Sequence, residues 1–278
     1  MPELPSQRRK LAWGAIGLFA AAVALTGLLD DPGRNYAEGA FSRALLTFAL
    51  ARTLDSAISV AQGTQVAVEP AGVGVNFALG EALDPLNDLV ERFSVAMLVA
   101  TSSLGLQNVL LRMSTWWGTN LALALSAALL LTALWRPALV GGLRHTAAIR
   151  LFLIFVFLRF AVPVFVIGTN LVFDAFLAAE HEAANQALTA TSMEIEALTD
   201  EATPPIEDRS FAQRLGDSLQ VLNVRERLEG LRVRVSSAVE QIINLIVIFA
   251  LQTIILPLAF LWLFAGFLKA LASRTTKL

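Results

Sequence analysis

The sequence contains no cysteine, and only two histidines and three lysines occur among its 278 residues. The lack of cysteine excludes disulfide bonds, thiol catalysis, iron–sulfur clusters and cysteine-based zinc sites. Charged residues make up only 16% of the chain, whereas 56% of it is hydrophobic, and the mean hydropathy is +0.63. Soluble domains of this length are rarely so apolar, so the composition predicts a membrane protein that crosses the bilayer several times.

Motifs for nucleotide binding and catalysis are also missing. Gly72 and Gly74 do not extend to a dinucleotide-binding loop, because Phe77 occupies the position of the third glycine, and no GxxxxGK[ST] loop occurs. The two histidines, His145 and His181, are predicted on opposite sides of the membrane, so they cannot share a metal ion within one chain. We therefore predict a protein that is not an enzyme, uses no cofactor or metal and does not bind nucleic acid.

Four apolar stretches are long enough to cross a hydrocarbon core of about 30 Å as helices. They cover residues 11–29, 119–135, 151–173 and 242–268. In the last, Pro257 predicts a kink because it leaves the carbonyl of Thr253 without its helical donor. A cleaved secretory signal is the alternative for the first, with Ala22-Val-Ala24 as the cleavage site, but the apolar run continues past Ala24 and favours a retained span.

The distribution of charge predicts how these spans are oriented. Residues 1–10, 136–150 and 269–278 together carry nine basic residues and one acid. The two remaining connections, 30–116 and 174–240, carry 22 acids and 11 basic residues. This asymmetry follows the positive-inside rule, so we expect an even number of spans with both termini in the cytoplasm.

The segment 30–116 is predicted to lie outside the cytoplasm and to combine strand with helix. Apolar residues alternate on both sides of Glu69-Pro-Ala-Gly72, which predicts a β-hairpin over about 58–79. Helical spacing then covers about 83–113. The stretch 93–111 within it has no charge but contains several polar residues, which favours an amphipathic helix at the membrane surface over a further span.

The stretch Leu54–Leu111, which includes AGVGVNF and LDPLNDLVERFS, resembles stretches of uncharacterised bacterial membrane proteins, and this resemblance implies no activity. We expect a multi-pass protein of the bacterial inner membrane that is embedded in the lipid bilayer.

The segment 174–240 carries a net charge of −7 and has the periodicity of two helices on either side of Thr203-Pro204-Pro205. Its two arms have nearly equal length, which predicts an antiparallel helical hairpin that projects from the membrane. Helices lying flat on the bilayer are the alternative, but such helices usually carry basic residues. The residues that we expect along the seam with a partner helix are Leu177, Leu188, Ile195, Leu219, Leu228, Leu231 and Val235.

The seam of this hairpin has two further features. It is predicted to continue from Val235 through Val239 and Ile242 to Ile246, so that one helix leads into the last span. His181 also falls on the seam, where a packed histidine is favoured over a metal-binding or pH-sensing one.

Arg159 is the only charged residue within the four spans. A charge at such a depth costs about 2.5–3.5 kcal/mol by insertion scales, so its side chain should face protein or water. The other spans contain no acid, and the expected neighbours are therefore Gln252, Asn244, Ser126 or backbone groups. With neutral neighbours only, Arg159→Leu should be neutral or stabilising, because hydrogen bonds between spans average about 0.6 kcal/mol.

The sequence thus predicts a mainly α, polytopic membrane protein with four transmembrane helices, an extracytoplasmic helical hairpin and a small β-hairpin. We expect a non-enzymatic scaffold or assembly protein that forms a homo-oligomer and recruits an extracytoplasmic protein partner through the helical hairpin. The alternative is an oligomeric channel or transport subunit in which Arg159, with Gln252 and Asn244, lines the permeation or coupling path.

Overall fold

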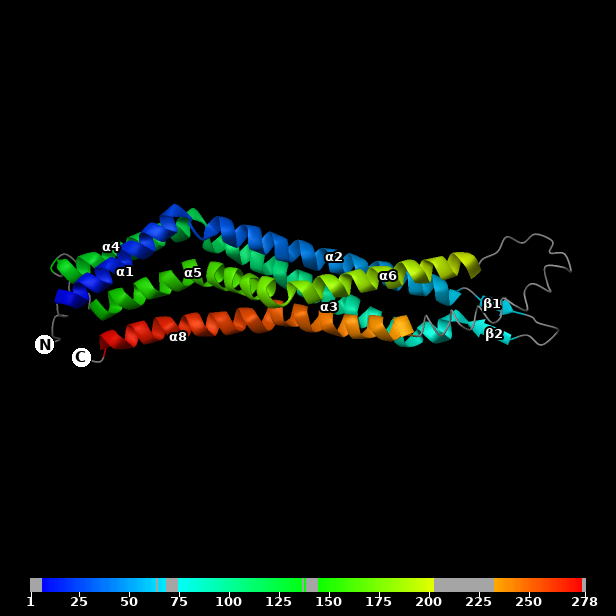
Figure 1. Cartoon of the computed structure of the whole chain (residues 1–278). Coiled ribbons are helices and arrows are strands. Elements are labelled where there is room, and N and C mark those ends of the chain that lie inside the picture. The colour runs from blue at the N-terminus through cyan, green and yellow to red at the C-terminus, as the bar shows by residue number, and fades with distance from the viewer. Residues whose placement is uncertain are drawn as a thin grey trace. The chain divides into compact units, whose positions relative to one another are not determined.

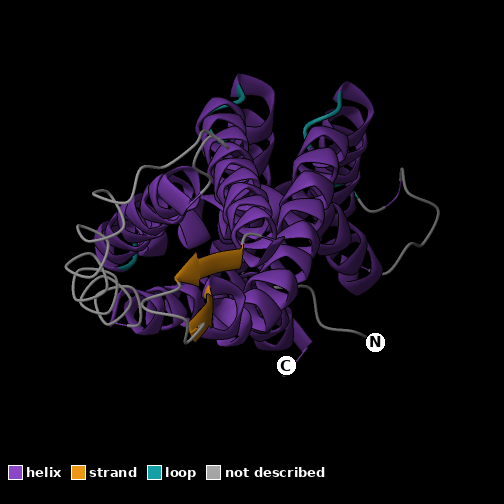
Figure 2. Cartoon of the chain, turned by 90° about the vertical axis from the view of Figure 1, so that its right-hand side faces the viewer, coloured by secondary structure: helices purple, strands orange, loops and turns teal. Residues whose placement is uncertain are grey.

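The structure is a computed structural model, and it describes residues 7–63, 65–68, 75–136, 138, 145–202 and 233–276. Nearly all of these residues are helical (Figure 2), so the fold is mainly α. The labelled helices of Figure 1 are α1 (Gln7–Thr26), α2 (Asp30–Gly63), α3 (Leu79–Ser114), α4 (Trp117–Trp135), α5 (His145–Phe176), α6 (Ala178–Ala202) and α8 (Leu256–Thr276). Residues 233–250 are also helical and lead into α8 through the π-helix Leu251–Ile255.

The chain forms two compact units, each assembled from parts that are distant in sequence. Unit 1 comprises Met1–Ser42, Ser102–Ala175 and Leu251–Leu278, and unit 2 comprises Arg43–Thr101 and Phe176–Ala250. The long helices α2 and α3 contribute residues to both units, because neither helix ends at the boundary.

Unit 1 has a core of aromatic and aliphatic side chains between α1, α4, α5 and α8. Trp13, Leu130, Phe152 and Leu268 lie in this core, and α1 packs along α4 (Figure 1). Large apolar side chains also cover the outside of unit 1, among them Phe19, Leu25, Leu125, Ile154, Leu158, Leu258, Trp262 and Phe267. An extensive apolar exterior over a packed core is typical of helices that face lipid.

Unit 2 is a bundle in which all four helical stretches bury residues at alternating steps of three and four. The buried positions with this spacing are Ala44, Thr47, Ala51, Leu54, Ile58 and Ala61 in α2, Leu83, Leu86, Val90, Phe93, Met97 and Ala100 in α3, His181, Ala184, Leu188, Thr191 and Ile195 in α6, and Val235, Ala238, Ile242, Leu245 and Phe249 in 233–250. This heptad spacing is the pattern of helices that supercoil around one another with a left-handed twist.

Two contacts show that α6 and the stretch 233–250 run antiparallel. Arg234 Nε lies 2.8 Å from Glu194 Oε2, and the rings of Phe249 and His181 meet edge to face at 5.5 Å. Residues early in one helix therefore lie beside residues late in the other. The predicted helical hairpin itself stays a prediction, because residues 203–232, which would join these two stretches, lie outside the described part.

The buried face of 233–250 differs from the predicted seam by one position. Ala238 and Leu245 are buried, whereas Val239 and Ile246 are only half-buried. The small side chain of Ala238 lets the helix approach its neighbours closely, and the bulkier Val239 is left at the edge of the contact. The apolar periodicity alone could not distinguish these adjacent positions.

The segment 30–116 contains less strand and more helix than the sequence predicts. The strands are β1 (Gln65–Val68) and β2 (Val75–Ala78), and they pair antiparallel with Gln65 opposite Ala78 and Val68 opposite Val75. Residues 58–63 of the predicted hairpin belong instead to α2, because Ile58 and Ala61 continue the heptad positions of that helix.

Five helical stretches are long and apolar enough to cross a membrane among the described residues. They are Asp30–Gln62, Leu86–Ser114, Trp117–Trp135, His145–Phe176 and Val233–Ser273. The last three correspond to predicted spans. The first predicted span appears as a shorter apolar helix, Lys10–Thr26, and the first two stretches fall within the segment 30–116, which was predicted to lie outside the cytoplasm and to contain no span.

Pro257 produces a π-helix in the preceding turn. Residues Leu251–Ile255 form this π-helix, and the carbonyl of Thr253 accepts hydrogen bonds of 3.4 Å from Ser103 Oγ and Gln107 Nε2 of α3. Side chains of another helix therefore bind the carbonyl that the proline cannot. The sequence predicts a kink at Pro257, and what the structure has before this proline is a π-helix whose Thr253 carbonyl is bound by α3.

Gly27 makes the turn between α1 and α2. Its φ is +65°, and its carbonyl accepts a 2.8 Å hydrogen bond from the amide of Asp30. Residues with a Cβ pay about 1–2 kcal/mol in this left-handed conformation, whereas glycine pays none. Gly27 therefore fixes where α1 ends and presents Asp30 as the first residue of α2.

We expect Gly27→Ala to destabilise the protein by about 1–2 kcal/mol, because alanine is strained at this φ. Gly266→Ala is the matched control, since Gly266 lies inside α8 with no atom within 4 Å of the added Cβ. That change should be neutral or stabilising by up to about 1 kcal/mol. Thermal unfolding in detergent measures both, and equal effects would argue against the strained turn.

Candidate functional site

Arg159 of α5 is the most deeply buried charged side chain among the described residues. It is 0% exposed and lies fourteen residues into the helix, about 21 Å from its start. Its Nη2 lies 2.7 and 2.8 Å from the two carboxylate oxygens of Asp30. The same nitrogen donates to the carbonyl of Ala24 at 3.3 Å, and Nε donates to Asn120 Oδ1.

These partners come from three helix ends within unit 1. Ala24 lies in the last turn of α1, Asp30 begins α2, and Asn120 lies in the first turn of α4. The C-terminal carbonyls of a helix carry a partial negative charge, so the guanidinium also suits the end of α1. Arg159 therefore connects α5 to both sides of the Gly27 turn and to the start of α4.

The expectation that Arg159 has only neutral neighbours is wrong. Asp30 is placed one residue beyond the predicted first span, yet the turn at Gly27 brings its carboxylate to the guanidinium. Neither Gln252, Asn244 nor Ser126 is a hydrogen-bond partner of Arg159. A long arginine side chain reaches several ångströms along a helix, so an acid outside the apolar run was within its range.

The ion pair changes the expected effect of mutations. The side chains of Arg159 and Asp30 are 1% and 14% exposed, so removing either partner leaves a largely buried, unpaired charge. Such losses cost about 3–5 kcal/mol. Arg159→Leu is therefore expected to destabilise, contrary to the neutral effect that the sequence predicts.

We expect Asp30→Asn to destabilise the protein by about 3 kcal/mol, while Asp31→Asn, an exposed neighbour in the same turn, stays within about 0.5 kcal/mol. The double variant Asp30→Asn/Arg159→Leu should lose less than the sum of the single losses, because it leaves no unpaired charge. Denaturant unfolding of the four proteins in detergent gives the coupling. If the losses of unfolding free energy in the two single variants simply added up in the double variant, Asp30 and Arg159 would not be energetically coupled, and this would contradict the ion pair.

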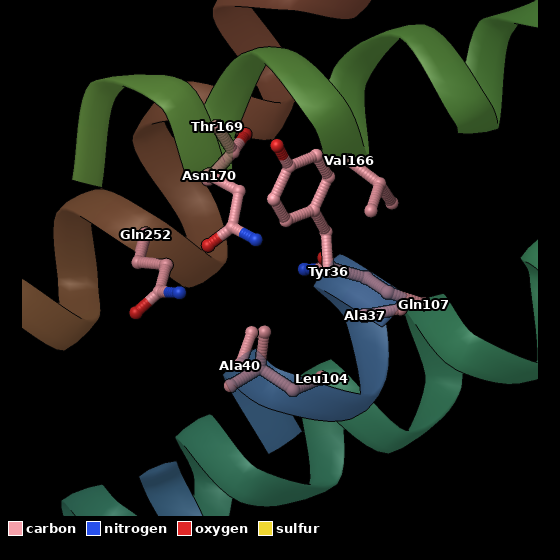
Figure 3. A pocket seen from close by; sticks show the side chains of 9 residues that line it. All are labelled: Tyr36, Ala37, Ala40, Leu104, Gln107, Val166, Thr169, Asn170 and Gln252. Atoms are coloured by element: carbon pink, nitrogen blue, oxygen red, sulfur yellow. The ribbon is translucent and has the colours of Figure 1, made fainter. Parts of the chain in front are cut away.

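Gln252, predicted to accompany Arg159, lies in a separate polar layer of unit 1. It occupies the π-helix and lines a small pocket with Tyr36 of α2, Gln107 of α3, and Thr169 and Asn170 of α5 (Figure 3). Asn244, the other predicted companion, is an exposed residue of unit 2. That Arg159, Gln252 and Asn244 line one permeation or coupling path stays a prediction.

A second polar cluster surrounds His181 in unit 2. The ring is 5% exposed, and its Nε2 lies 3.3 Å from both Thr47 Oγ1 and Asn185 Nδ2. Thr47 Oγ1 also donates to Asn185 Oδ1 at 3.3 Å. The amide nitrogen facing Nε2 suits a neutral imidazole, in which Nε2 accepts a hydrogen bond.

Burial lowers the pKa of His181 below its ordinary value of 6.5, and the nearby Arg43 lowers it further, while Glu182 opposes the shift. A histidine with a lowered pKa binds its proton less readily in the folded than in the unfolded protein. Its contribution to stability is therefore complete above pH 6.5 and is lost as the pH falls towards the folded pKa.

We expect the thermal midpoint of unit 2 to fall between pH 7.5 and pH 5, because protonation of His181 favours the unfolded state. His181→Gln should reduce this dependence, and His145→Gln, which changes the other histidine of the chain, should leave it unchanged. Unfolding scans followed by circular dichroism test this. An identical pH dependence in wild type and His181→Gln would exclude His181 as its source.

The remaining seam residues fall into two groups. Leu188, Ile195 and Val235 are buried, and Leu177 is half-buried at the junction of α5 and α6. Leu219, Leu228 and Leu231 lie outside the described residues. The helical spacing predicted over about 83–113 is confirmed in α3, where Leu86, Val90, Phe93 and Met97 are buried on one face.

Comparison with known proteins adds no identification, since no family model, curated protein or solved structure matches the chain. The fold and the two polar clusters nevertheless define a class. The chain is a helical protein with several apolar helices long enough to cross a membrane, which is consistent with a multi-pass membrane protein.

Proposed function

We propose that the protein is a non-enzymatic, multi-pass scaffold of the bacterial inner membrane, which forms a homo-oligomer and recruits a protein partner outside the cytoplasm. The observation that supports this proposal most strongly is that the helices differ in the polarity of their exposed residues. The exposed positions of α1, α4, α5 and α8 are largely apolar, whereas those of α6 include Glu180, Glu182, Gln186 and Glu196. Lipid suits the first set and water suits the second.

Four spans are proposed, formed by α1, α4, α5 and the helical run that ends in α8. The helix α2 meets the length and hydropathy of a span, but it exposes Arg34, Glu38 and Arg52. Each exposed charge at the centre of a bilayer costs about 2.5–3.5 kcal/mol, which favours an aqueous location for α2. The antiparallel arms of unit 2 support an extracytoplasmic helical hairpin that begins at α6.

The burial of Arg159 supports a structural role over an ion path. A pore arginine must face water, whereas this guanidinium is fully buried and is bound by groups of its own chain. The alternative function, an oligomeric channel or transport subunit, requires an arrangement of subunits that exposes Arg159.

Photocrosslinking in cells tests the scaffold. A photoreactive amino acid at Met193, an exposed apolar residue of α6, should give a defined protein adduct, either with a second copy or with a different protein. The control position is Phe267, an exposed residue of α8 that is proposed to face lipid and should give none. Absence of any adduct at Met193, Glu182 and Gln186 would contradict recruitment through α6.

Reporter fusions in cells test the membrane topology, and purified protein in liposomes tests the channel alternative. Reporter fusions near Pro204 should read external, and fusions after Arg144 and at the C-terminus should read cytoplasmic. Liposomes containing wild-type protein should show no ion conductance. A reproducible anion current would contradict the scaffold proposal and support the channel alternative.

A further inference from the structure

The helix α3 carries a second line of mostly apolar residues on the side opposite its buried face. These exposed residues follow one another at alternating steps of four and three, and they are Val95, Val99, Ser102, Leu106, Val109 and Met113. The five apolar members are 52–63% exposed. We call this line the outer stripe of α3. A helix whose outer side faces water usually exposes polar residues there, so the outer stripe indicates a surface that a partner covers.

The neighbour of α3 along the outer stripe is α2, which runs antiparallel to it. A Cβ added to Gly105 of α3 would lie 3.4 Å from the ring of Phe41 in α2. Further along, Gln62 Nε2 of α2 donates to Asp84 Oδ1 of α3 at 3.1 Å. Residues later in α2 therefore lie beside residues earlier in α3, and the two helices share the same length.

The exposed charges of α2 argue against lipid as the partner. Arg34, Glu38 and Arg52 are exposed, and they occur shortly before Phe41 and between Phe41 and Gln62. They therefore belong to the part of α2 that lies beside the outer stripe. Hydrocarbon around α3 over this length would also surround these charges, which is unfavourable. The partner that covers the outer stripe is consequently a protein.

A second copy of the chain fits the outer stripe by its geometry. Two copies in one bilayer hold α3 in the same direction and at the same depth. A two-fold axis along the membrane normal then places each residue of the outer stripe opposite its own counterpart. The outer stripe contains no charged residue, so no like charges meet at the axis. Alternating steps of four and three residues are also the seam spacing of two parallel helices.

We propose that the outer stripe of α3 is the surface through which two copies of the chain form a parallel, symmetric pair. Each copy buries its outer stripe against that of the other, and α6 stays exposed for a different protein partner. This inference rests on the proposed homo-oligomer and assigns the surface that forms it.

Cysteine crosslinking in native membranes tests the pair, because the chain has no cysteine of its own. Val99→Cys and Leu106→Cys should each give a disulfide-linked dimer on mild oxidation. Residues opposite their own counterparts along such a seam approach within the Cα separation of about 4.4–6.8 Å that a disulfide needs. Ser237→Cys, at an exposed serine of the stretch 233–250, is the control and should stay monomeric on the gel. Equal yields at all three positions, or no dimer from Val99→Cys and Leu106→Cys, would overturn the proposal.

A charge in the outer stripe should separate the two copies. Leu106→Glu is expected to raise the dissociation constant of the dimer by about tenfold or more, because two carboxylates meet at the axis. Helical circular dichroism should not change, since Leu106 is exposed in the single chain. Ser59→Glu, at an exposed serine of α2, is the control and should leave the dissociation constant unchanged. Sedimentation equilibrium in detergent measures it, and an unchanged dimer in Leu106→Glu would contradict the interface.

Further outcomes separate this interface from the proposed homo-oligomer itself. A wild-type dimer that crosslinks through Met193→Cys of α6, and not through the outer stripe, would overturn the α3 interface and leave the homo-oligomer standing. A wild-type chain that is monomeric at every concentration in lipid would overturn both. A spin label on Leu106→Cys that collides more often with lipid-dissolved oxygen than with a water-soluble nickel complex would identify lipid as the partner and overturn the proposal.

Discussion

The ion pair between Arg159 and Asp30 is the interaction on which the arrangement of unit 1 depends. The guanidinium is completely buried, and the hydrogen bonds of its Nε and Nη2 come from the ends of α1, α2 and α4. The pair is costly to break from one side, because the remaining charge has no access to water. Such a contact determines which helix ends meet, so it selects one arrangement of helices that apolar packing alone would leave open.

Polar contacts elsewhere in the chain also occur where helices are irregular. The π-helix before Pro257 frees a carbonyl, and Ser103 and Gln107 of α3 bind it. Apolar side chains attract one another in any register, whereas a free carbonyl is satisfied only by donors at the right height. The polar layer near Gln252 therefore fixes the register between α3 and the last helix.

The helices of unit 2 pack against one another mainly through apolar heptad positions. Their buried positions follow a heptad, in which α2 contributes the alanines Ala44, Ala51 and Ala61 and α3 contributes larger residues such as Phe93 and Met97. His181 and Thr47 add a hydrogen-bonded cluster to a seam that is otherwise mainly apolar, and burial lowers the pKa of the histidine.

The sequence by itself determined the helical class, three of the long apolar helices and the heptad of α6, because hydropathy and spacing of three and four residues are local properties. It did not determine the extent of α2, where a helical heptad prevails over the alternation that favours strand. The partner of Arg159 was decided only by tertiary structure, since Gly27 turns the chain and brings Asp30 back to α5 across 129 positions. That Gln252 lines a polar pocket with Tyr36, Gln107 and Asn170 likewise follows from which helix faces meet, and that depends on packing between distant segments.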